Sequence, residues 1–324
     1  MAAGDPTGIV GLVANPMAGK DIRRLVSAAS PVSDMAKVGI IRRALIGAFE
    51  AGATKIIVSD DRSALARRAA EGVDGDIEAL DLATMSTSRD SQRAAAAMAE
   101  AGVSTVIVLG GDGTHRDVAK GWRDAAMVTL STGTNNVFPR SVESTLAGQA
   151  AGLVASGRVR LVDCARRAKV IDVALDDGAT DLALVDIALT DDSFTASRAV
   201  WRVDTLKELV AVIAEPASVG LSAIAAAVAP LARASAGGVH VRLGEQGRPV
   251  RAPIAPGRFE TLSIVDHRRL ATNESVQLVG PGVLSFDGER DVILDDGAAT
   301  LTISPDGPWV IDVPAALAAG QPTT

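Results

Sequence analysis

The first 140 residues alternate short apolar runs with amphipathic stretches of helical period, and this alternation constrains the fold more than any other feature of the chain. Residues 105–109, Thr-Val-Ile-Val-Leu, form a nearly continuous apolar run without alternation of polar and apolar positions. Strands of this kind are covered on both faces by helices, which is typical of a parallel sheet. We therefore predict an N-terminal parallel-sheet α/β domain over residues 1–157.

The same two periods predict the individual elements of this domain. Gly52 and Gly102 each follow a helical stretch and provide the left-handed position at which many helices end. We expect strands over 9–13, 55–58, 77–82, 105–109 and 127–130, and helices over 38–49, 63–71, 90–101 and 115–122.

Beyond about residue 160 the pattern changes to short alternating segments separated by turn dipeptides. Segments 170–175 and 182–189 flank Asp176-Asp177-Gly178 and predict a hairpin. We therefore predict a mostly antiparallel β domain over 158–305, and a C-terminal segment, 306–324, that returns to the first domain. Further strands are expected over 239–243, 261–265, 276–278, 283–286, 292–294 and 300–303.

Two helices are expected inside this β domain. One covers residues 201–215 and is ended by Pro216. The other lies in the apolar segment 217–232, which is too short for a membrane span and contains Pro230. We therefore predict a buried helix there and no membrane span.

Charge and composition exclude several classes of function. The 32 Lys and Arg and 39 Asp and Glu give a net charge of −7 with no basic block, and aromatic residues are 2% of the chain. Bulk nucleic-acid binding is therefore not expected. Cys164, which we interpret as an inert buried thiol, and three histidines cannot form a disulfide or a usual zinc set, so we assign no metal-ligating residue. The absence of a signal-peptide pattern and the single cysteine favour a cytoplasmic location.

A glycine-rich segment follows the strand at 105–109, at the sheet edge where open α/β folds bind ligands. It reads Gly110-Gly111-Asp112-Gly113-Thr114 and opens a helix. Glycines let backbone N–H groups approach an anion, and a helix start adds positive partial charge, so a nucleotide phosphate fits there. The alternative is an ordinary strand-to-helix turn with Asp112 capping the helix.

Two more polar turns follow strands at the same edge. One contains Asn15 and Lys20, and its alternative is a plain surface turn. The other contains uncharged hydroxyls and amides, which suit a ribose or an adenine edge. It is formed by Thr132, Gly133, Thr134, Asn135 and Asn136.

Taken as a set, these motifs resemble those of the NAD kinase and diacylglycerol/sphingosine kinase superfamily. The set comprises the Asn-Pro-Met-Ala-Gly turn at 15–19, Gly-Gly-Asp-Gly-Thr at 110–114 and Gly-Thr-Asn-Asn at 133–136. Within that superfamily, residues 14–25 and 130–139 are similar to the ATP-NAD kinase-like proteins of acetoin catabolism, the acetoin X proteins. The similarity runs over nearly the whole chain and is clearest in the first 150 residues.

The resemblance implies phosphoryl transfer from ATP, with Mg²⁺, in a cleft between the two domains. By this resemblance Asp112 is the general base on the acceptor hydroxyl. The segment Asp287-Gly288-Glu289 is similar to the Asp-Gly-Glu of the lipid kinases, where the acidic pair assists catalysis; the alternative is a plain hairpin turn. The implied nucleotide contacts are Asn15, Gly110, Gly111, Gly113, Thr114, Thr132, Gly133, Thr134, Asn135 and Asn136.

The implied function is an ATP-dependent kinase acting on NAD or a related small molecule, in acetoin catabolism. The alternatives are a nucleotide sensor that binds ATP or NAD without turnover, and a lipid or sphingoid-base kinase. The chain has no Gly-x-Gly-x-x-Gly after its first strand and no Walker motif, which disfavours a dehydrogenase and a P-loop enzyme. The resemblance also implies a homo-oligomer formed through the β domain.

Overall fold

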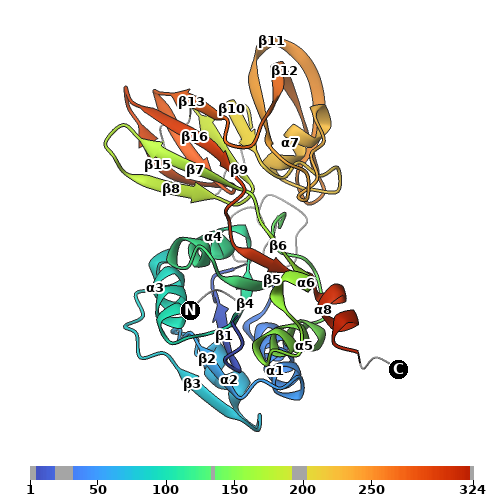
Figure 1. Ribbon diagram of the computed structural model, residues 1–324. Coiled ribbons are helices and arrows are strands. Elements are labelled where there is room, and N and C mark those ends of the chain that lie inside the picture. The colour runs from blue at the N-terminus through green and yellow to red at the C-terminus, as the bar shows by residue number, and fades with distance from the viewer. Residues whose placement is uncertain (1–4, 19–31, 133–135, 192–202, 322–324) are drawn as a thin grey trace.

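A computed structural model describes residues 5–18, 32–132, 136–191 and 203–321, and it has an α/β part and a β part (Figure 1). The α/β part is built on a seven-stranded sheet with the order β3-β2-β1-β4-β5-β17-β6. Its first five strands in that order are parallel to one another. Their bounds are β1 Ile9–Ala14, β2 Lys55–Val58, β3 Asp76–Ala79, β4 Thr105–Gly110 and β5 Ala126–Ser131.

Helices cover both faces of this sheet, as the apolar strands predicted. One face carries α1 (Asp34–Glu50), α2 (Leu65–Ala70) and α5 (Ser144–Ala155), and the other carries α3 (Ser88–Glu100) and α4 (Asp112–Gly121). Helices α1 and α5 pack closely because a Cβ on Gly148 would lie 2.0 Å from the carbonyl oxygen of Ala44. The predicted α/β architecture is therefore confirmed.

The chain returns to this sheet after the β part. Strand β17 (Trp309–Ile311) pairs in parallel with β5 and antiparallel with β6 (Ala165–Arg167). Two short helices, α6 (Leu161–Cys164) and α8 (Val313–Ala319), pack against each other beside it. The first and last parts of the β region are thus both attached to one edge of the sheet.

The β part is a mostly antiparallel sandwich, as predicted. A six-stranded sheet with the order β12-β11-β10-β9-β14-β15 faces a four-stranded sheet with the order β13-β16-β7-β8, and one apolar cluster contains side chains from both sheets. Helix α7 (Leu221–Val228) packs on β11 in a second apolar cluster. The strands are β7 Val170–Leu175, β8 Thr180–Ala183, β9 Asp186–Thr190, β10 Leu206–Ala211, β11 Gly238–Ala255, β12 Arg258–Leu270, β13 Ser275–Val279, β14 Gly282–Phe286, β15 Glu289–Leu294 and β16 Ala298–Ser304.

Two sequence predictions in the β part are wrong. The helix predicted over 201–215 is the strand β10 in the described residues, because this segment pairs with β9 on one side and β11 on the other. The single strand predicted over 182–189 is two strands in different sheets, β8 and β9. Non-local pairing decides both outcomes and leaves no local signal.

Helix α4 lies at the boundary between the two parts. Val118 and Ala119 of α4 share an apolar cluster with Val170, Leu182 and Leu184 of the β part. The helix begins at Asp112, three residues earlier than predicted. Among the described residues, no helix is long and apolar enough to cross a membrane.

Candidate functional site

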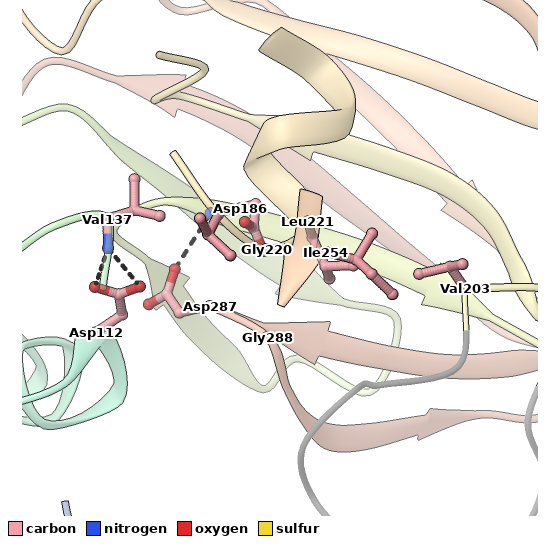
Figure 2. Close-up of a pocket in the computed structure, with 10 residues that line it drawn as sticks. Asp112, Val137, Asp186, Val203, Gly220, Leu221, Ile254, Asp287 and Gly288 are labelled. Carbon is pink, nitrogen blue, oxygen red and sulfur yellow. Dashed lines mark hydrogen bonds between the residues drawn. The ribbon is translucent and has the colours of Figure 1, made fainter. Parts of the chain in front are cut away.

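A cleft lies between α4 and the β part, with carboxylates at one end and apolar side chains at the other (Figure 2). The carboxylates come from both parts of the molecule: Asp112 from α4, Asp186 from β9 and Asp287 from the turn after β14. The lining residues are Asp112, Val137, Asp186, Val203, Val219, Gly220, Leu221, Ile254, Asp287 and Gly288.

Asp112 is the first residue of α4 and is buried, with 7% of its surface exposed. Its Oδ1 accepts hydrogen bonds from the backbone N–H groups of Val137, at 3.1 Å, and Phe138, at 2.9 Å. The N-cap position of α4 is Gly111 rather than Asp112. The structure therefore does not support the alternative in which Asp112 only caps its helix.

The turns after β1 and β4 meet beside Asp112. Asn15 donates from Nδ2 to Oγ1 of Thr114 at 3.0 Å, and its Oδ1 accepts the N–H of Met17. Gly110 approaches the same hydroxyl side chain, because a Cβ on Gly110 would lie 2.4 Å from the Cβ of Thr114. Gly113 is also in the first turn of α4. Gly110, Gly111, Gly113 and Thr114, four of the predicted nucleotide contacts, thus lie where β4 leads into α4. Asn15, a fifth, contacts this turn through Thr114.

The third polar turn is described only in part. The N–H of Thr132 donates to the carbonyl of Gly110 at 3.1 Å, which joins the turns after β4 and β5. Asn136 donates from its amide to the hydroxyl of Ser131. The predicted contacts Gly133, Thr134 and Asn135, and Lys20 of the first turn, lie outside the described residues.

Asp287 lies in the two-residue turn between β14 and β15. Asp287 has φ 50° and Gly288 has φ 79°, which is the left-handed pair typical of a tight hairpin turn. The Asp287 carboxylate accepts the N–H groups that precede and begin β9, from Leu184, Val185 and Asp186, at 2.8 to 3.2 Å. The backbone of this motif is therefore the hairpin turn that was the alternative to a catalytic acidic pair.

Burial dominates the titration of Asp287. It raises the pKa of the carboxyl group, against the opposing effects of Arg116 and the three N–H donors. Arg116 itself is buried in α4, donates to Asp291 at 2.5 Å and lies over the ring of Phe286 at 4.9 Å. The buried carboxylate of Asp287 is therefore surrounded by three backbone N–H donors and one buried cation, Arg116.

Glu289, the second acidic residue of the predicted pair, lies against α4. Its carboxylate carbon and one oxygen would both be 3.5 Å from a Cβ on Gly113. Asp112 and Glu289 therefore both bring negative charge to the first turn of α4. A phosphate chain bound there would need a cation to offset that repulsion.

Three neighbouring side chains of α4 follow Asp112: His115, which its place beside the glycine-rich turn made a possible catalytic histidine with a structural role as the alternative, and Arg116 and Asp117, which were not predicted as site residues. All three are buried, because α4 lies between the two parts. Burial lowers the pKa of His115 to about 4 and raises the pKa of Asp117 to about 6. A polar run directly after a glycine-rich loop gives no sign of this, since burial depends on the distant β part.

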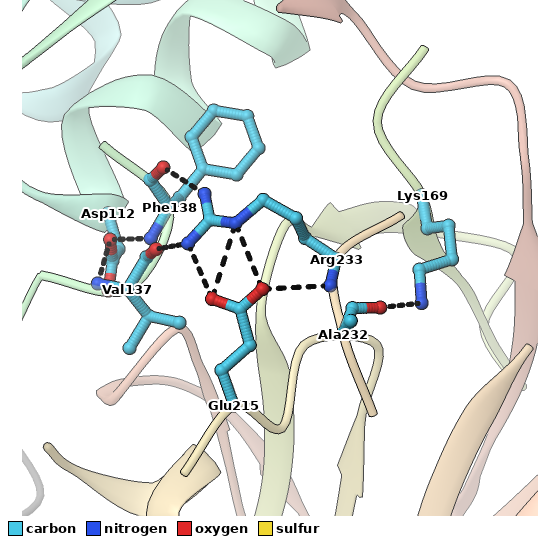
Figure 3. Close-up of polar contacts among 7 residues, drawn as sticks. All are labelled: Asp112, Val137, Phe138, Lys169, Glu215, Ala232 and Arg233. Carbon is cyan, nitrogen blue, oxygen red and sulfur yellow. Dashed lines mark hydrogen bonds and ion pairs between the residues drawn. The ribbon is translucent and has the colours of Figure 1, made fainter. Parts of the chain in front are cut away.

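An ion pair from the β part holds the loop that binds Asp112 (Figure 3). Arg233 pairs with Glu215 at 2.9 Å and donates to the carbonyls of Val137, at 2.9 Å, and Phe138, at 3.1 Å. Burial acts to raise the pKa of Glu215, but the hydrogen bonds from Arg233 hold it below its ordinary value. Neither residue was predicted from the sequence to take part in the site.

Two other side chains, the Lys169 amine and the Cys164 thiol, have pKa values that burial shifts. Lys169 donates to the carbonyl of Gly237 at 3.1 Å, and burial lowers its pKa to about 8. Cys164 is buried, and burial raises the pKa of its thiol to about 11, as an unreactive thiol requires. No group of three or more His, Cys, Asp or Glu side chains able to hold a metal occurs in the described part of the chain.

Comparison with known proteins gives related families for both parts of the chain. Residues 59–167 match the diacylglycerol kinase catalytic domain, and residues 169–306 match the acetoin catabolism protein X C-terminal domain. Acetoin catabolism protein X from Cupriavidus necator is 35% identical over 329 aligned residues, which cover 95% of this chain and 91% of that protein.

Two solved structures share the fold. Yeast NADH kinase complexed with NADH matches with a TM-score of 0.54 and 13% identity, over 95% of this chain and 84% of that chain. A candidate diacylglycerol kinase from Bacillus anthracis matches with a TM-score of 0.50 and 14% identity, over 95% of this chain and 98% of that chain. The fold is therefore kinase-like throughout.

Proposed function

The chain belongs to the family of the acetoin catabolism X proteins, and from that premise we propose that it is an ATP-dependent kinase with a small-molecule hydroxyl acceptor. The observation that carries the proposal is the position of Asp112. Its carboxylate is held at the start of α4, at the edge of a cleft between the two parts, beside the glycine-rich turn. A fixed carboxylate next to a phosphate-binding turn is what phosphoryl transfer to a hydroxyl needs.

The nucleotide would bind as its Mg²⁺ complex. The described carboxylates form no three-ligand metal set, and we expect the phosphates of ATP to hold most of the ion's ligand positions. Glu289 and Asp186 are the carboxylates near the cleft that could provide one or two further contacts. Mg²⁺ would offset the negative charge of Asp112 and Glu289 at the first turn of α4. The backbone N–H groups of Gly111 and Gly113 and the hydroxyl of Thr114 are our proposed phosphate contacts.

In the transfer step, Asp112 accepts the proton of the acceptor hydroxyl as its oxygen attacks the γ-phosphorus. The new bond joins that oxygen to phosphorus, and the bond from the γ-phosphorus to the bridging oxygen breaks, releasing ADP. Asp287 holds the hairpin turn that forms the opposite wall of the cleft. We assign Asp287 this positioning role and leave the proton transfer to Asp112.

The acceptor would enter from the apolar end of the cleft. Val203, Leu221 and Ile254 line that end, and none of the lining residues that the structure describes is Lys or Arg. This favours an acceptor whose hydroxyl-bearing end has no phosphate group. If NAD is the acceptor, its diphosphate would have to bind outside the apolar end of the cleft. The relation to acetoin catabolism adds small hydroxyl compounds to NAD as candidates, and the apolar wall keeps a lipid or sphingoid base as a second one.

Product detection by mass spectrometry tests the proposal. The protein is incubated with ATP, Mg²⁺ and a panel of NAD, NADH, acetoin, a sphingoid base and diacylglycerol, alongside Asp112→Asn and the exposed control Asp163→Asn. A kinase adds one phosphate to one acceptor, in the wild type and the control but not in Asp112→Asn. Nucleotide binding without any phosphorylated product would favour the alternative, a sensor that binds ATP or NAD.

Two further expectations remain predictions. We propose a homo-oligomer formed through the β part, which size-exclusion chromatography with light scattering tests. A single apparent mass equal to one chain, 33.0 kDa, would contradict it. We also propose a cytoplasmic location, which cell fractionation tests.

A further inference from the structure

One peptide group connects Arg233 to Asp112. The carbonyl oxygen of Val137 accepts from Nη2 of Arg233 at 2.9 Å, and the N–H of Phe138, which belongs to the same peptide group, donates to Oδ1 of Asp112 at 2.9 Å. The result is a continuous chain of hydrogen bonds from a guanidinium cation, through one peptide, to a carboxylate (Figure 3).

Arg233 is fixed where it can act in this way. Glu215 accepts from Nε and Nη2 of Arg233 at 2.9 to 3.3 Å and also accepts its backbone N–H at 3.0 Å. The second terminal nitrogen of Arg233 donates to the carbonyl of Phe138. Both residues belong to the β part, Glu215 after β10 and Arg233 after α7, whereas Asp112 belongs to the α/β part.

A hydrogen bond from a cation to a peptide carbonyl polarises that peptide and strengthens the bond that its N–H donates, by roughly 10–30% per bond in condensed-phase estimates. Here the strengthened bond ends on Asp112. We propose that Arg233 stabilises the ionised carboxylate of Asp112 through the Val137–Phe138 peptide, so that the β part controls the charge and orientation of the candidate base. The role of Asp112 as a base rests on the proposed function; its hydrogen-bond chain does not.

Other charges also act on Asp112, and they define what Arg233 must counter. Asp186 and Asp287 line the same cleft, and Glu289 lies at the first turn of α4. His115 and Arg116 follow on the helix, with Arg116 already engaged by Asp291. Three nearby carboxylates favour protonation of Asp112, and the peptide held by Arg233 opposes them.

The amide resonance of Phe138 reports on this chain without any need for turnover. The chain has five Phe residues, so ¹⁵N-Phe labelling gives a simple spectrum of the full-length protein. A strong hydrogen bond to a carboxylate moves an amide proton downfield, and the resonance follows the protonation of that carboxylate as pH is lowered. Asp112→Asn assigns the resonance and removes its response to pH.

Two variants then give opposite predictions. Arg233→Gln removes the cation, so the Phe138 amide should move upfield and its pH midpoint should rise by about 0.5 unit or more, a three-fold change in proton affinity. Glu215→Gln removes the anion that balances Arg233, so the midpoint should fall. If Arg233 only supports the loop mechanically, both variants loosen it and both midpoints move in the same direction.

Arg233→Lys keeps the charge but not the two-pronged geometry, and its midpoint should lie between those of the wild type and Arg233→Gln. The remaining Phe resonances control for the fold. Midpoints that move together, or a Phe138 resonance that ignores Arg233→Gln while the other resonances stay in place, would overturn the proposal. Absence of kinase activity would leave this result untouched, because no substrate is present in the spectrum.

Discussion

Two aspartates face the same cleft, yet the regions around them differ in how their carboxylates are held. Asp287 accepts three N–H groups from Leu184, Val185 and Asp186, all within the β part and beside its own hairpin turn. Asp112 accepts two from a loop of the α/β part, and that loop is itself held by Arg233 of the β part.

We propose that this difference separates a folding role from a chemical one. All three N–H donors to Asp287 belong to the β part, so its carboxylate stabilises a turn there, and Arg116 of α4 adds a nearby buried cation. The surroundings of Asp112 require both parts, so its carboxylate responds to how they are arranged. We propose that Asp112, which lies beside the glycine-rich turn, is the carboxylate placed where a substrate and a nucleotide can meet.

The largest expected effect separates chemistry from binding at Asp112. Asp112→Asn removes the proton acceptor but keeps a side chain of the same size, so kcat should fall by about 10²- to 10⁴-fold. MgATP affinity, measured by calorimetric titration, should change only a few-fold. Near-normal kcat in this variant would remove Asp112 from the proposed mechanism.

The second effect is a loss of stability at Asp287. Asp287→Ala leaves three buried N–H groups without their acceptor, and each such group costs about 1–3 kcal/mol, so we expect a loss of about 3 kcal/mol or more. Urea unfolding measures this directly. Asp287→Asn is the matched control, since it retains one acceptor oxygen and Asn tolerates the left-handed backbone at this position. Equal stabilities of the two variants would contradict this account of the turn.

The third effect is on the pH dependence of stability, through α4. The folded-state pKa of His115 is lowered to about 4 from 6.5, so its contribution is complete above pH 6.5 and is lost as pH falls toward 4. The pKa of Asp117 is raised to about 6 from 3.8, so its burial is unfavourable above pH 6 and is relieved as pH falls. Each pKa shift changes the free energy of unfolding by about 3 kcal/mol over its full pH range, and in the wild type the two changes oppose each other.

Single variants expose the two slopes. The stability of His115→Asn should increase as pH falls from 6 to 4, because only the Asp117 effect remains. The stability of Asp117→Asn should decrease over the same range, and more steeply than that of the wild type, because only the His115 effect remains. Thermal melting at a series of pH values measures both. Identical slopes in the two variants would show that neither group titrates as its burial predicts.

The smallest effects concern the glycines of the turn before α4. A Cβ on Gly110 would meet Thr114 at 2.4 Å, so Gly110→Ala must move that side chain and weaken MgATP binding. A Cβ on Gly113 makes ordinary contact with Glu289, so Gly113→Ala should leave stability unchanged or raise it by up to about 1 kcal/mol. Calorimetric titration and melting of the pair test whether the turn is tight at Gly110 alone; equal losses of stability would contradict that.

The sequence predicted the α/β part well because its signals are local. The apolar strand at 105–109 and the glycine-rich turn after it needed no distant partner to be recognised. In the β part the segment around Leu206–Ala211 has a spacing that also fits a helix, and only its pairing with β9 and β11 makes it a strand.

The site shows the same division. Asp112 and Thr114 were recognisable from their place after a strand, and Asn15 from its turn. Arg233 contacts the loop across 95 residues of sequence, and Arg116 contacts Asp291 across 175. Such pairs have no signature in a single sequence, because each half of the pair is an ordinary charged residue until the chain folds.

The most direct test of the account compares the two isosteric variants Asp112→Asn and Asp287→Asn in one assay, with turnover expressed per folded molecule on the acceptor found by mass spectrometry. We expect turnover of Asp112→Asn to be at least about 100-fold below that of Asp287→Asn, while Asp287→Asn has the lower melting temperature. Equal turnover, or a loss confined to Asp287→Asn, would contradict the central claim that Asp112 is the group that acts on the substrate.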